Sequence, residues 1–387
     1  MVQPDKLWLM DNATLAHNLR RLRDEKGLSQ AQVAERTGIS RVAYRNIETG
    51  TAAPRTGTLT SLAAALGVKI PDLMVEVHPL RAVRFRQKKM TSREQVLVRV
   101  SRWLEAYREL ESLLGRKKPF AFASAKVTGP AQGAERLKKL AEAARRSARL
   151  GPKDAIRDVC ELLEDNGVKV YPLCIANDGF FGLSVAKDDG GPAVVVNTWE
   201  RISVERWIFT AAHELGHLLL HLGAYSVDNR DENKAEEKEA DKFAAYFLMP
   251  AEVFAGAWRE TRGLSFVERV LKVKRLFRVS YRTVLHRVQD TTPLGKAVWG
   301  RFQAEYKAQY GRTLAITEEP LGLKPAMVEP HSAHEPDRLT PHEFNGERLK
   351  RLVREAIEQE KISLGRGAEI LGMDLANMRN LAESWVE

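Results

Sequence analysis

Two histidines and a glutamate in the segment WIFTAAHELGHLLLH have the spacing of a metal site. His213 and His217 are four residues apart, so on a helix their rings project from one face and can bind one metal ion. Glu214, between them, is turned toward the open coordination position, where it can accept a proton from water. A pair of core histidines that bind only protein groups is the alternative. The apolar flanks favour the metal site, because unpaired imidazoles are costly in a buried helix.

Two histidines do not complete a zinc site, so a third protein ligand is needed. A third histidine at position 223, as in the extended metzincin pattern, is excluded because that residue is Gly223. The better candidate is Glu237 in AEEKEADKFAAYFLMP, where Asp241 follows one turn later and can fix a histidine ring through its free N–H. A solvated acidic face is the alternative for these carboxylates. Three further residues stay as alternative ligands: His221, Glu236 and Glu239.

The elements around these residues predict a small α+β domain. An amphipathic helix, DAIRDVCELLEDNG, precedes three β-rich runs, VKVYPLC, FFGLSVAK and PAVVVNT, which are separated by turn residues. Two helices follow, at about residues 204–222 and 234–248, and they carry the candidate ligands. We expect the run near residues 194–196 to form an edge strand of the sheet.

The first part of the chain predicts a helix-turn-helix. Five short helices are expected between residues 15 and 73, and LSQAQVAERTGISRVAYRNIETG has the short, glycine-containing turn that is typical of the motif. Polar residues at the starts of its two helices would face DNA, with arginine suited to guanine. A protein-docking helix bundle is the alternative. The DNA-contact candidates are Gln30, Ser40, Arg41, Arg45 and Asn46.

Charge and composition support this division. Residues 1–150 carry 29 Lys and Arg against 14 Asp and Glu, whereas the remaining residues carry 32 against 37. A basic first part is typical of a nucleic-acid-binding arm. No apolar run approaches the roughly 18–20 residues of a membrane span. The two cysteines are too few for a disulfide framework, and the start has no apolar signal core, so a cytoplasmic protein is expected.

Four regions are expected along the chain. They are a DNA-binding domain at 1–78, a basic helical linker at 79–150, the metal domain at 151–290 and a C-terminal region at 291–387. The tail contains a second helix-turn-helix-like pattern, but its charge is near neutral and its third helix offers few basic residues. We therefore expect a packing or partner-binding unit there rather than a second DNA-binding domain.

FTAAHELGHLLLH followed by EKEADKFAAYFLMP resembles the ImmA/IrrE-type metallopeptidases, which have a gluzincin-like fold. FFGLS, PAVVVNT and a preceding XRE-type helix-turn-helix extend the resemblance to the fused subclass of that family, over roughly residues 12–290. The resemblance implies that His213, His217 and Glu237 bind one zinc ion per chain, with Glu214 as general base. It also implies that a substrate peptide pairs with the edge strand near residues 194–196 by backbone hydrogen bonds. Three residues stay unranked as the group that stabilises the oxyanion: Tyr171, Tyr225 and His221.

The expected fold class is α+β and multidomain, with an all-α XRE-type bundle, a small zincin-like metallopeptidase domain and a helical C-terminal segment. The resemblance implies a cytoplasmic transcription regulator, in a stress-response setting, that cuts a specific protein such as a repressor or antitoxin. A single helix-turn-helix reads a half-site, so a homodimer on a double-stranded operator is expected. The alternative is a regulator or antitoxin whose metal domain is a sensor or partner-binding module. An intact Glu214 favours the enzyme, because a sensor does not need it.

Overall fold

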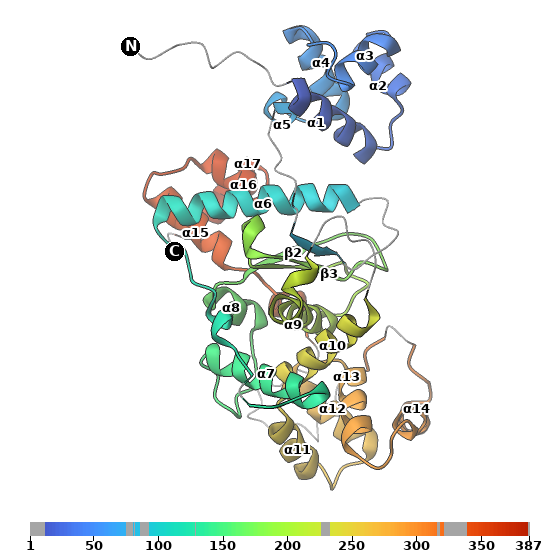
Figure 1. The fold of residues 1–387 in the computed structure, drawn as a ribbon. Helices are drawn as coiled ribbons and strands as arrows, with labels where there is room; N and C mark the ends of the chain where they lie inside the picture. Colours follow the sequence, from blue (N-terminus) through green and yellow to red (C-terminus); the bar gives the residue numbers. More distant parts are fainter. Residues whose placement is uncertain are drawn as a thin grey trace. The chain divides into compact units, whose positions relative to one another are not determined.

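The computed structural model describes residues 12–74, 80, 82–85, 93–127, 129–225, 233–315, 318–320 and 339–385. The chain forms two compact units (Figure 1). The first comprises residues 1–80 and 90–102, and the second comprises residues 81–89 and 103–387. No helix among the described residues has both the length and the apolar character needed to cross a membrane.

The first unit is a bundle of short helices around a small apolar core. Leu15, Leu19, Val33, Tyr44 and Leu62 are among its buried side chains. The helices are α1 (Asn12–Glu25), α2 (Gln30–Thr37), α3 (Arg41–Glu48), α4 (Thr56–Leu66) and α5 (Ile70–Met74).

Caps fix the turn between α2 and α3. Ser29 begins α2 with a reciprocal capping box to Gln32, and the Ser40 hydroxyl accepts the Ala43 N–H at the start of α3. Gly38 ends α2 with φ +70°, a conformation that glycine adopts without strain. Each of the two helices therefore begins directly after a capping serine.

The second unit contains a four-stranded mixed sheet in the order β1-β3-β4-β2. β2 and β4 are parallel, and the other two pairs are antiparallel. Because β4 is paired on both sides and its valines are fully buried, the expectation that residues 194–196 form a free edge is wrong. The strands are β1 (Val83–Phe85), β2 (Lys169–Leu173), β3 (Gly182–Val185) and β4 (Ala193–Asn197).

Helices enclose this sheet in one continuous apolar core that includes Phe122, Val196, Phe243 and Phe302. α10 packs against both α9 and α7, and α12–α14 pack together further along the chain. The helices and short 3-10 turns of this part are η1 (Ala121–Ser124), α7 (Gly133–Ser147), α8 (Val159–Asp165), η2 (Lys187–Asp189), α9 (Val204–Leu220), η3 (Leu222–Ala224), α10 (Lys234–Leu248), α11 (Ala251–Glu260), α12 (Phe266–Phe277), α13 (Tyr281–Thr291) and α14 (Ala297–Tyr310).

The tail forms α15 (Arg348–Glu358), α16 (Leu364–Leu371) and α17 (Leu375–Glu383). It packs on residues 103–114 of α6 (Arg93–Leu114), the part of that helix that belongs to the second unit. Buried Arg348 binds the Glu111 carboxylate at 2.6 Å, and Arg366 binds Glu109 at 2.5 Å.

The pair α16–α17 repeats the local geometry of α2–α3. Gly372 ends α16 with φ +66°, as Gly38 ends α2. The caps have the same spacing in both pairs: Ser29, Gly38 and Ser40, and Ser363, Gly372 and Asp374. That the tail is a packing or partner-binding unit stays a prediction.

Candidate functional site

The structure brings His213 and His217 of α9 together with Glu237 of α10. One ligand atom from each lies within 4.8 Å of the others. The two histidine Nε2 atoms are 2.9 Å apart, and each lies 3.2–3.3 Å from a Glu237 carboxylate oxygen. All three residues are buried, with exposed fractions of 0%, 1% and 7%. This cluster could hold a metal ion.

A glycine sets the distance between the two helices of the cluster. A Cβ on Gly216 would lie 2.9 Å from a Phe243 ring carbon and 3.4 Å from the Ala240 backbone. Without that Cβ, α9 and α10 approach closely enough for Glu237 to reach both imidazoles. The second x of the H-E-x-x-H motif, Gly216, therefore cannot be replaced freely, because it is a packing contact between the two helices.

Hydrogen bonds to the outer ring nitrogens fix both tautomers. His213 Nδ1 lies 2.8 Å from Asp241, so the imidazole donates there and its Nε2 lone pair points into the cluster. On the other side, His221 Nε2 donates to Glu239 at 3.1 Å, and its Nδ1 faces His217 Nδ1 at 2.9 Å. His217 must then donate from Nδ1, which leaves its Nε2 lone pair inside the cluster as well.

The charge states suit a divalent cation. Burial lowers the pKa of His217 to about 3, so that imidazole is neutral. Burial alone would raise the pKa of Glu237, but the His213 and His217 side chains beside it lower that pKa overall, so Glu237 is a carboxylate. Two imidazoles and one carboxylate are the donor set of three-ligand zinc sites, so the residues present fit that ion.

Glu214 lies beside the cluster and is held by a strand. Its Oε2 accepts a hydrogen bond from the Ser184 hydroxyl of β3 at 2.7 Å, and Ser184 accepts one from the Tyr225 hydroxyl at 2.7 Å. The carboxylate is 1% exposed, so these contacts determine where it points. Ser184 was not among the residues predicted from the sequence, although a lone serine in the apolar run FFGLSVAK is a usable signal.

The alternative ligands have other partners in this structure. Glu239 binds His221, whereas Glu236 forms an ion pair with Arg84 of β1. The same guanidinium lies 3.2 Å from Glu237 Oε1. No feature of the sequence near residue 84 indicated this contact.

The unranked oxyanion candidates are likewise engaged. The Tyr225 hydroxyl donates to Ser184, and the Tyr171 ring stacks on Trp103 with ring centres 4.5 Å apart. His221 lies between His217 and Glu239. The geometry therefore does not single out one of the three for that role.

The helix-turn-helix candidates differ in whether their side chains make contacts within the unit. Arg41, Arg45 and Asn46 of α3 are exposed. Gln30 donates to Glu48, a buried carboxylate that also binds Arg23 at 2.5 Å. The Ser40 hydroxyl caps α3. The structure thus places three of the five candidates on the surface of α3 and gives the other two contacts within the unit.

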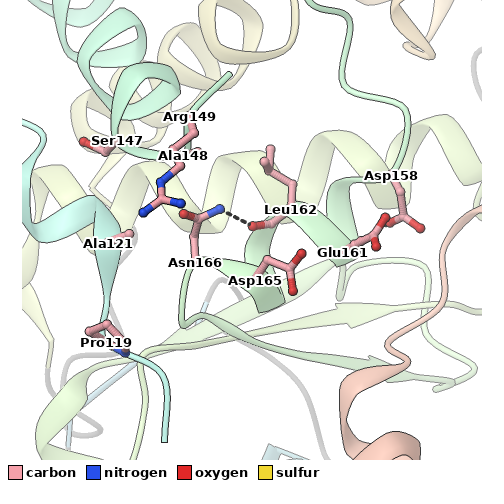
Figure 2. A pocket seen from close by; sticks show the side chains of 10 residues that line it. All are labelled: Pro119, Ala121, Ser147, Ala148, Arg149, Asp158, Glu161, Leu162, Asp165 and Asn166. Atoms are coloured by element: carbon pink, nitrogen blue, oxygen red, sulfur yellow. Dashed lines mark hydrogen bonds between the residues drawn. The ribbon is translucent and has the colours of Figure 1, made fainter. Parts of the chain in front are cut away.

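A cavity of about 530 Å³ lies between η1, α7 and α8, away from the cluster (Figure 2). Its charged side chains are largely exposed, and within it Asn166 donates to the Leu162 carbonyl at 2.8 Å. None of the metal-cluster or DNA-contact candidates lines it. We therefore locate the candidate site at the cluster on α9 and α10.

Residues 175–289 match the family model of the IrrE N-terminal-like domain. The match to the IrrE N-terminal-like domain includes β3, β4, α9 and α10, and thus every residue of the metal cluster. Residues 19–73 match a helix-turn-helix family model. These two matches, in this order, confirm the predicted fusion and the α+β multidomain fold class. No curated protein matches the chain.

Proposed function

We propose that this protein is a DNA-binding regulator whose IrrE N-terminal-like domain is a zinc-dependent endopeptidase. The observation that carries the proposal is the buried cluster of His213, His217 and Glu237, with the Glu214 carboxylate beside it. A carboxylate next to a three-ligand metal site is where the general base of a metal-dependent hydrolase accepts a proton from water. The proposed substrate is one specific protein, such as a repressor or antitoxin.

Each residue at the site has a separate role in the proposed reaction. A zinc ion held by the three cluster residues would supply a Lewis acid that acidifies water and polarises a peptide carbonyl. Glu214 would accept the proton from the attacking water and pass it to the leaving amine. The Ser184 hydroxyl holds that carboxylate in place, while Asp241 and His221 keep both imidazole lone pairs directed inward.

The proposed DNA function rests on α3. Arg41, Arg45 and Asn46 are exposed on the helix that occupies the recognition position of the motif. Gln30 and Ser40 lie at the starts of α2 and α3, where phosphate contacts are typical. We propose a cytoplasmic homodimer that binds a double-stranded operator, because one helix-turn-helix reads a half-site.

A second function is favoured by one observation. β1 covers the outer edge of β3, the strand that holds Glu214 through Ser184. A domain whose substrate edge is always covered would be a metal sensor or a partner-binding module with little proteolysis.

The Glu214→Gln variant separates the two functions. If the protein is an endopeptidase, the variant retains zinc but fails to regulate a reporter driven by the operator. Its zinc content is measured by mass spectrometry of the purified protein. Wild-type regulation by the zinc-loaded variant would reject the endopeptidase in favour of the sensor.

A further inference from the structure

The strand next to Glu214 has one edge at which a peptide could be added. β3 contacts Glu214 through Ser184, and a Cβ on Gly182 would lie 3.4 Å from a Glu214 oxygen. The inner edge of β3 is paired with β4. An extended peptide that reaches Glu214 by strand addition must therefore pair with the outer edge of β3.

In this structure a short segment of the chain itself occupies that edge. β1 runs antiparallel to β3, with Val83 opposite Val185, Arg84 opposite Ser184 and Phe85 opposite Leu183. The pairing continues to Ala82, whose carbonyl accepts the Ala186 N–H at 2.9 Å. A strand of three residues contributes few hydrogen bonds, so it is suited to exchange with a competing peptide.

The side chain of Arg84 lies on the face of the sheet that carries the site. Directly opposed residues in an antiparallel pair project to the same face, and Ser184 projects toward Glu214. Arg84 therefore projects to that face too, where its guanidinium binds Glu236 and lies 3.2 Å from Glu237. Two carboxylates at the start of α10 thus receive a basic side chain from a strand paired beside Glu214.

We infer that β1 occupies the position of a substrate peptide, with Arg84 in a site for a basic side chain. This inference rests on the proposed endopeptidase function, and it names the substrate class. The substrate is an extended segment with Arg or Lys opposite Ser184, and that side chain binds Glu236. β1 competes with the substrate and keeps the site closed until it is displaced.

The inference is tested with the full-length, zinc-loaded protein in the Glu214→Gln background, so that no peptide is cut. The probe is a fluorescein-labelled peptide with the sequence LRAVRFRQKK, residues 80–89 of this chain. Its affinity is measured by fluorescence anisotropy, and the exchange of the β1 and β3 amides is followed by hydrogen–deuterium exchange. The variant is Arg84→Ala, and the control is Arg262→Ala, which removes an exposed arginine outside the sheet.

Arg84→Ala should speed hydrogen–deuterium exchange of the β1 amides and tighten peptide binding about tenfold. That gain is expected if β1 covers the edge of β3 in roughly 90% of the molecules, because only the remaining tenth can then bind the peptide. A peptide with alanine at the matching arginine should lose most of this gain. Glu236→Ala should also release β1 from β3, because it removes the partner of Arg84. This variant should nevertheless bind the arginine peptide more weakly than the Arg84→Ala variant does, because Glu236 also binds the peptide's basic side chain. The Arg262 variant should behave as the parent.

Two results would overturn the inference. One is faster exchange in β1 with no gain in peptide affinity, which would show that the freed edge is not the peptide site. The other is unchanged exchange and affinity in the Arg84 variant, which would show that this arginine does not hold β1. Neither result bears on the proposed peptidase, because binding is measured with the base removed.

Discussion

The recognition helix α3 and the metal cluster place their polar residues in opposite environments. Arg41, Arg45 and Asn46 are exposed, whereas His213 and His217 are at most 1% exposed. The exposed residues can change without disturbing the fold. The buried residues are part of the core, and their polar atoms are satisfied only by one another and by their neighbours. The proposed metal ligands are therefore also core residues, whereas the proposed DNA contacts on α3 are not.

The largest expected effect is that of His217→Ala. The change removes a proposed ligand and one buried partner each of His221 and Glu237, so metal binding should be lost and the domain destabilised by about 2–5 kcal/mol. Thermal unfolding with and without a chelator measures both effects. The chelator should lower the melting temperature of the wild type but not that of the variant. An equal chelator shift in both proteins would show that the metal does not bind here.

A buried carboxylate outside the cluster gives the next largest effect. Burial raises the pKa of Glu164 to about 7 from 4.5. The folded state then retains a proton that the unfolded chain releases, so this group lowers stability as pH rises from about 4.5 to 7. Above pH 7 the raised pKa of Glu164 lowers the free energy of unfolding by about 3 kcal/mol in full. Glu164→Gln should remove this loss of stability. The glutamine carbonyl can still accept the hydrogen bond from the Arg348 backbone N–H, which the Glu164 carboxylate accepts at 2.9 Å.

Denaturant unfolding at pH 5 and pH 8 measures this difference. The wild type should lose more stability between the two values than the Glu164 variant does. Glu161→Gln is the matched control, because Glu161 lies on the same helix but is exposed. If the two variants have the same pH dependence, burial of Glu164 does not control it.

Asp241→Ala should have an intermediate effect. The aspartate orients the His213 ring at 2.8 Å but is not itself in the cluster, so its loss should weaken zinc affinity about 10–100-fold. Competition with a coloured zinc chelator measures the affinity, and Glu237→Ala should weaken it more strongly. A larger loss for Asp241→Ala than for Glu237→Ala would reverse the proposed roles.

On α3, Arg45→Ala should cost about 1–3 kcal/mol of specific DNA binding with no change in melting temperature. The measurement is anisotropy on an operator selected from random DNA by the wild-type protein. The loss should be confined to one or two base positions. Equal losses on the operator and on random DNA would show that Arg45 contacts phosphate only.

The smallest effect is expected from Arg379→Ala on α17. This arginine has the same place in α16–α17 as Arg45 has in α2–α3, and it is also exposed. Because the tail is near neutral in charge, operator affinity should change less than about twofold. A loss as large as that of Arg45→Ala would make the tail a second DNA-binding unit.

Local patterns were sufficient to predict much of this protein. The i, i+4 histidines and the following E-x-x-x-D helix identified residues that the structure brings together. Ser29, Gly38 and Ser40 fixed the ends of α2 and α3, because caps depend on a few neighbouring residues.

Contacts between distant segments could not be predicted in the same way. The pairing of residues 83–85 with 183–185 depends on the whole fold, so neither β1 nor the Arg84 contact was foreseen. The wrong prediction that residues 194–196 form an edge strand could have been avoided from the local sequence. An unbroken apolar run is typical of a central strand that is covered on both faces, and β4 is such a strand.

The central claim is that Glu214 serves proteolysis by a metal centre. The most direct measurement compares new protein N-termini, by labelling and mass spectrometry, in cells carrying the wild type or the Glu214→Gln variant at equal levels. The proposed function predicts a cut in one or a few proteins that requires Glu214 and also disappears with His217→Ala. Identical N-termini in all three strains, under conditions where the wild type regulates its operator, would contradict it.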